Sequence, residues 1–96
     1  MPIANALDAI TPRMAGMLGM LLDQQHRPAV ARAFDLSPSA VRDELHKAMA
    51  ITLTTNQDEL VRWWRRHRVA WALRVLERAD IEVEELVRIS GPEAGR

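Results

Sequence analysis

Ten consecutive residues of this 96-residue chain, 62–71, combine side chains that bind anions with side chains that stack or pack. The segment reads RWWRRHRVAW and holds four arginines, one histidine and all three tryptophans of the chain. Arginine binds phosphate and carboxylate groups, whereas tryptophan anchors hydrophobic cores and protein interfaces. Two interpretations follow: a surface that binds nucleic acid, and the buried interface between the helices of a dimer.

A second set of polar side chains lies in residues 38–50, where apolar residues recur at helical spacing. Val41, Leu45 and Ala48 fall on one face of the expected helix. The opposite face carries residues that a helix in the major groove of DNA would direct toward base edges and phosphates: Ser39, Arg42, Asp43, His46 and Lys47. The alternative is an ordinary solvated face, on which Arg42, Asp43, Glu44 and Lys47 pair with one another. Glu44 would also bring negative charge toward the groove.

Catalysis and metal binding find little support in the sequence. His26, His46 and His67 lie in different segments, and the motifs of metalloproteases, serine hydrolases and nucleotide-binding enzymes are absent. Asp43 and His46 are three residues apart, but a metal site needs a third ligand, and the chain has no cysteine. We therefore expect no enzyme activity, no metal and no cofactor.

The charge of the chain is balanced overall and segregated along its length. Thirteen basic residues match thirteen acidic ones, so net charge by itself indicates neither a nucleic-acid partner nor a membrane partner. Residues 51–78 hold six arginines against three acids, whereas residues 79–96 hold five acids against two arginines. The longest apolar run, residues 14–22, is too short to cross a bilayer, so we expect a cytoplasmic protein without a membrane partner.

Helix signals recur along the chain, and no segment alternates as a strand would. Thr11 and Ser37 each precede a proline, a pairing typical of helix starts, and Asn56 precedes two acids that suit a first helical turn. The signals predict helices at 12–22, 28–34, 38–50, 57–79 and 80–90, with a brief helix or packed arm at 3–10. The expected fold is all-α, a compact bundle of about four helices with a long fourth helix and a short C-terminal helix.

The chain also carries a series of familiar residues at matching separations. They are Thr11-Pro12-Arg13, Pro28-Ala29-Val30-Ala31, Ser37, Ala40-Val41, Leu45 and Asn56. With this series, residues 10–61 resemble the helix-turn-helix domain of LuxR/GerE-type bacterial transcription regulators. Two departures stand out: Gln24 or Gln25 replaces the turn glycine of the family, and Thr52-Leu53-Thr54 replaces its usual Leu-Gly-Val.

The resemblance implies a single helical domain, 1–96, in which a helix-turn-helix module (10–61) is followed by a helical extension (62–96) that is a candidate dimerisation element. Residues 38–50 would be the recognition helix, and Arg13 and Arg27 would contact the DNA backbone. Related domains are expected to form dimers through the last helix. We expect an oligomer interface made of Trp64, Trp71, Val69, Leu73 and Leu76.

Two function classes remain open. The first is a small dimeric transcription regulator that binds double-stranded DNA. The second is a helical adaptor or inhibitor that keeps the same scaffold but binds another regulatory protein or a polymerase subunit, using the arginine and tryptophan residues of segment 62–71. Clustered arginines and the spacing of the resemblance favour DNA, whereas zero net charge and an acid-bearing recognition helix favour protein.

Overall fold

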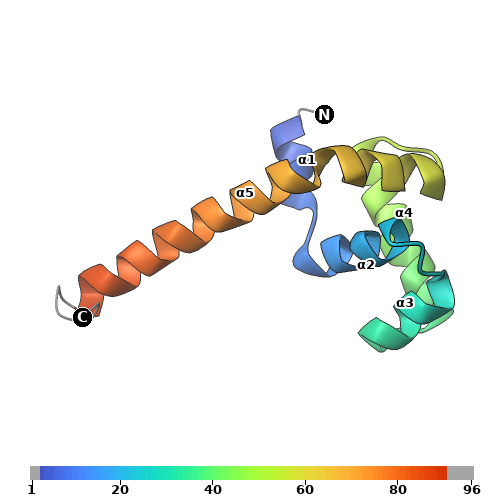
Figure 1. The fold of residues 1–96 in the computed structure, drawn as a ribbon, viewed down its shortest axis with the longest axis horizontal. Helices are drawn as coiled ribbons and strands as arrows, with labels where there is room; N and C mark the ends of the chain where they lie inside the picture. Colours follow the sequence, from blue (N-terminus) through green and yellow to red (C-terminus); the bar gives the residue numbers. More distant parts are fainter. Residues whose placement is uncertain (1–2, 91–96) are drawn as a thin grey trace.

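The structure, a computed structural model, describes residues 3–90, without the side chains of residues 4, 80–87, 89 and 90. Over this range the chain forms five helices and no strand, which confirms the expected all-α fold (Figure 1). The helices are α1 (Ile3–Ala9), α2 (Pro12–Leu22), α3 (Arg27–Phe34), α4 (Pro38–Thr52) and α5 (Gln57–Ser90).

Side-chain caps start three of these helices where the sequence predicts them. The Thr11 hydroxyl accepts a hydrogen bond from the Met14 amide (3.1 Å), and the Ser37 hydroxyl accepts one from the Ala40 amide (3.1 Å). The Asn56 side-chain oxygen accepts one from the Glu59 amide (2.9 Å). Each bond satisfies an amide that the first helical turn leaves without a partner, and it fixes where the helix begins.

Left-handed residues end α2, α3 and α4. Gln24, Asp35 and Leu53 have φ angles of 62°, 53° and 57°. In each case the next amide donates back to a carbonyl five residues earlier, at 2.9–3.0 Å, in the Schellman arrangement that usually has glycine at the left-handed position. The resemblance predicts glycine at residue 24 or 25 and at residue 53, and Gln24 and Leu53 have the left-handed conformation that glycine adopts most easily.

The core lies where α2, α3, α4 and α5 meet. Its largest fully buried side chains come from all four helices: Met17, Leu18, Val30, Val41, Leu45 and Leu60. Gly16 lets α3 approach α2, because a Cβ atom added there would lie 2.7 Å from the ring of Phe34. Burial of these apolar side chains holds α4 against the bundle by one face only.

The long helix α5 corrects one sequence expectation. Residues 57–90 form one helix of 34 residues, so the break predicted at residues 79–80 does not occur. Asp80 can start a helix, but it costs little inside one, and neither glycine nor proline interrupts α5. The first part of α5 contacts α1, α2 and α4, and the last part projects away from the bundle (Figure 1).

Candidate nucleic-acid interface

The outer face of α4 presents all five residues that the sequence predicts to face the base edges and phosphates of DNA. Ser39, Arg42, Asp43, His46 and Lys47 are exposed. Val41 and Leu45, on the opposite face, are 0% and 1% exposed. The helix is therefore fixed by its apolar side while the polar side chains face solvent.

The exposed side chains of α4 make only loose contacts with one another. Arg42 lies 3.8 Å from the Asp43 carboxylate, and both side chains are more than half exposed. The hydroxyl of Ser39 lies 3.2 Å from that of the capping Ser37. A pair of exposed charges at this distance contributes little to stability, so Arg42 can exchange this contact for a ligand at small cost.

Arg27 joins this face from α3. A groove between the two helices is lined by Arg27, Pro28 and Ala31 of α3 and by Pro38, Ser39 and Arg42 of α4. The Arg27 Nε atom also donates to the side-chain oxygen of Gln57 at 2.7 Å, which ties α3 to the start of α5. The fold thus brings two expected DNA-contacting arginines, 15 residues apart in sequence, to one groove.

Arg13 and Glu44 form an ion pair that the sequence interpretation missed. Glu44 was expected on the solvated face, with its charge toward the groove, but it is only 8% exposed. Its carboxylate accepts a hydrogen bond from Arg13 of α2 at 2.9 Å and lies 3.6 Å from Lys47. Helical spacing could have predicted this burial, because residue 44 lies three residues after buried Val41 and four before buried Ala48 and so shares their face of α4.

The tryptophans of α5 separate into two environments. Trp64 is 5% exposed and belongs to the core, and Trp71 packs against it edge to face with ring centres 5.5 Å apart. The Trp71 indole N–H donates to the Ile10 carbonyl at 3.0 Å. The sequence left two roles open for these tryptophans, the core or an interface. In the structure both Trp64 and Trp71 contact the rest of their own chain.

Val69, Leu73 and Leu76, the other residues expected at an oligomer interface, are exposed by 66%, 55% and 57%. They lie four and three residues apart and so share one side of α5. We call these three residues the exposed stripe of α5.

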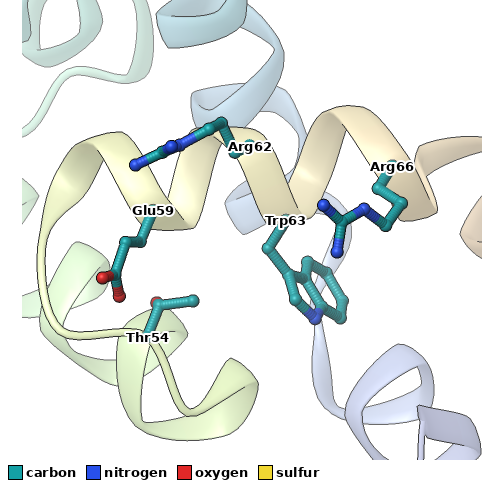
Figure 2. Close-up of a pocket in the computed structure, with 5 residues that line it drawn as sticks. All are labelled: Thr54, Glu59, Arg62, Trp63 and Arg66. Carbon is teal, nitrogen blue, oxygen red and sulfur yellow. The ribbon is translucent and has the colours of Figure 1, made fainter.

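A cleft with basic and aromatic walls lies at the start of α5 (Figure 2). Thr54, Glu59, Arg62, Trp63 and Arg66 line it. Figure 2 shows the Arg66 guanidinium beside the Trp63 indole and the Glu59 carboxylate turned toward the loop before α5. The His67 ring stacks on the Trp63 indole, with the ring centres 4.4 Å apart.

The Glu59 carboxylate in this cleft is hydrogen-bonded to the residues that precede α5. It accepts hydrogen bonds from the Thr55 amide and hydroxyl, both at 3.0 Å, and these bonds lower its pKa below the usual value. Glu59 therefore keeps its charge and holds the residue before the Asn56 cap, and the arginines are the groups of the cleft that can bind an anion.

A second cluster that sequence reasoning missed joins α1 to α5. Asp8 accepts two hydrogen bonds from Arg74, at 2.6 and 2.7 Å, and it also pairs with Arg78. The hydrogen bonds from Arg74 lower the pKa of the Asp8 carboxyl. No local sequence pattern predicts the pairing of Asp8 with Arg74, because the two residues are 66 positions apart in the sequence.

Comparison with known proteins adds no relative. No family model, no curated protein and no solved structure matches the chain. The described residues also contain no group of three metal-ligating side chains, and no described helix has the length and apolar character to cross a membrane. The relation to LuxR/GerE-type domains stays a prediction from residues 10–61.

Proposed function

We propose that this protein is a small transcription regulator that binds double-stranded DNA as a homodimer and inserts α4 into the major groove. One observation carries the proposal: Arg42, His46 and Lys47 are exposed on a helix whose opposite face is fully buried. A recognition helix needs this combination of a rigid mount and free polar side chains.

The connection between α3 and α4 supports this role. Three residues, 35–37, join the two helices, which is the turn length of helix-turn-helix motifs. Asp35 supplies the left-handed conformation in the turn, and Ser37 caps α4. The left-handed conformation of Leu53 also agrees with the glycine expected there from the resemblance.

Charge around α4 supports contact with phosphate as well. Arg27 shares a groove with Arg42, and Lys47 is 66% exposed at its side chain. Arg13 keeps about half of its side chain in solvent while it pairs with Glu44, so it contributes a cation whose position is fixed. Cations of this kind position a protein on the duplex, and side chains such as Arg42 read guanine edges.

A protein-binding adaptor is the second candidate function. Asp43 lies on the same exposed face as Arg42 and Lys47, and an acid there opposes the approach of phosphate. The exposed stripe of α5 offers an apolar surface that a protein partner could cover. These two features are the ones that favour a protein partner over DNA.

Titration of a fluorescent mixed-sequence duplex, followed by anisotropy at several salt concentrations, tests the DNA proposal. If about six phosphates are neutralised per dimer, the logarithm of the binding constant falls with the logarithm of salt with a slope of about −5. The double variant Arg42→Ala, Lys47→Ala should bind at least about tenfold more weakly and show a shallower slope.

Arg78→Ala is the control for loss of positive charge away from α4, and it removes one charge where the double variant removes two. Arg78 lies 21 residues along α5 from Gln57, about 30 Å from the end that contacts α4. Its affinity should stay within about twofold of the unmodified protein. Absent or salt-independent binding of the unmodified protein, or equal losses in both variants, would favour the adaptor.

A further inference from the structure

We propose that the second copy in the homodimer docks on the exposed stripe of α5, and that the two α5 helices run antiparallel. This inference rests on the homodimer of the proposed function. It deepens that function by naming the contacting surface, the orientation of the two chains and their alignment. It draws on three features of α5: an apolar stripe, its position opposite the bundle, and the distribution of charge along the helix.

The exposed stripe lies on the side of α5 that faces away from the bundle. Leu73 follows Trp71 by two residues, which corresponds to about 200° around the helix, so the two side chains point in nearly opposite directions. Trp71 contacts the Ile10 carbonyl of its own chain, whereas Leu73 is 55% exposed. A helix with apolar residues on two opposite sides requires a second surface to cover the outer one.

Charge along α5 favours an antiparallel second copy. Residues 62–68 contain four arginines and no acid, whereas residues 77–85 contain five acids and one arginine. Parallel pairing would place the arginine segments side by side and the acidic segments side by side. Antiparallel pairing places each arginine segment along the acidic segment of the other copy, which lowers the electrostatic energy.

One alignment combines this charge match with the exposed stripe. When the two-fold axis passes between residues 74 and 75, segment 62–68 lies opposite segment 81–87 of the second copy, which holds three of the five acids of segment 77–85. The same alignment brings Leu73 of each copy to the level of Leu76 in the other, so two described, exposed leucines from each chain meet at the axis. Asp80 then falls at the level of Val69, within one turn of Arg66.

The helix is long enough for this arrangement. About this axis, residues 59–90 of the two copies overlap, a length of roughly 48 Å at the helical rise. The projecting end of α5 would lie along the basic start of the other α5 instead of standing alone in solvent. The two bundles would lie on opposite outer sides, because each packs on the face of α5 that carries its own Trp64 and Trp71.

Disulfide trapping tests the orientation, since the chain has no cysteine of its own. Val69→Cys and Asp80→Cys are made as separate proteins, mixed to allow exchange, and oxidised. We expect a disulfide-linked dimer in the mixture and little in either protein alone, because in this alignment residue 69 lies about 16 Å along the helix axis from residue 69 of the second copy. A parallel dimer would instead link Val69→Cys to itself, and that result would overturn the proposal.

The mass in solution, measured by light scattering, tests the surface. Leu73→Glu with Leu76→Glu should convert a dimer to a monomer, and far-UV circular dichroism should show the helical content retained, because both side chains are exposed within their own chain. Leu53→Glu is the control, since Leu53 is 70% exposed at the end of α4, and it should remain dimeric. A monomeric unmodified protein, or an unchanged mass in the double variant, would refute the stripe.

The DNA titration and the dimer measurements can each refute one proposal without refuting the other. A monomer that still binds DNA with the expected salt dependence would overturn the pairing and leave DNA binding standing. A disulfide-trapped antiparallel dimer that binds no duplex would overturn DNA binding and leave the pairing standing.

Discussion

The ion pair between Arg13 and Glu44 should measurably stabilise the fold, and Arg13→Ala is the direct perturbation. The Arg13 Nη2 atom and the Glu44 Oε1 atom are 2.9 Å apart, with the Glu44 side chain 10% exposed and that of Arg13 52% exposed. A hydrogen bond to a charged group contributes about 1.5–3 kcal/mol. Because half of Arg13 stays in water, we expect a coupling energy at or just below the lower limit, about 1–1.5 kcal/mol.

Loss of Arg13 should cost more than loss of Lys47, the other cation near the same carboxylate. Lys47 lies 3.6 Å away and is 66% exposed, so Lys47→Ala should change the unfolding free energy by less than about 0.5 kcal/mol. Arg13→Ala should lower the melting temperature by about 5–10 °C, since 1 kcal/mol corresponds to about 4–8 °C in a domain of this size.

Urea unfolding followed by circular dichroism, applied to Arg13→Ala, Glu44→Ala and the double variant, isolates the coupling from the loss of side-chain packing. A coupling energy below about 0.3 kcal/mol would refute the reasoning, because the two single changes would then act independently. Equal effects of Arg13→Ala and Lys47→Ala would refute it as well, since distance and burial would not matter.

Three further predictions concern α2, α5 and α1. Gly19→Ala should stabilise the protein by about 0.5–1 kcal/mol in the same urea assay, whereas Gly16→Ala should gain less or lose stability, because only Gly16 has the Phe34 ring 2.7 Å from the added Cβ. Trp71→Ala should lower the melting temperature, as the Ile10 carbonyl loses its donor, but leave the mass of the folded protein unchanged, because Trp71 faces its own bundle. Asp8→Asn should destabilise the protein at neutral pH, and the loss should shrink as pH falls below the ordinary carboxyl pKa of 3.8. The reason is that the lowered pKa of Asp8 gives a contribution to stability that is lost as the carboxylate is protonated. A difference in melting temperature that stays constant with pH would contradict this.

Helix starts could be predicted from the sequence because their cause is local. Thr11, Ser37 and Asn56 each bind an amide three residues later, and that bond depends on no other part of the chain. The same holds for the placement of Val41 and Leu45 on one side of α4, which follows from helical periodicity. The expected bundle, and the exposure of Arg42 and Lys47 on its surface, depend on such local rules.

Tertiary contacts account for what the sequence could not predict. The burial of Glu44 depends on Arg13 from another helix, and Asp8 meets Arg74 only after α1 folds back on α5. The continuity of α5 through residues 79–80 was missed for a different reason. Asp80 and the acids after it are compatible both with a new helix start and with the interior of an existing helix, and no glycine or proline decides between them.

The arginine and tryptophan residues of segment 62–71 serve different surfaces because α5 turns each residue by about 100° relative to the one before it. Trp64 and Trp71, seven residues apart, fall on one side and bind α5 to the bundle. Val69, between them in sequence, is 66% exposed on another side. One continuous helix can therefore hold the bundle with one face and offer the other to a second copy. A break at residue 79 would have removed this possibility, because the stripe and the acidic segment would no longer share an axis.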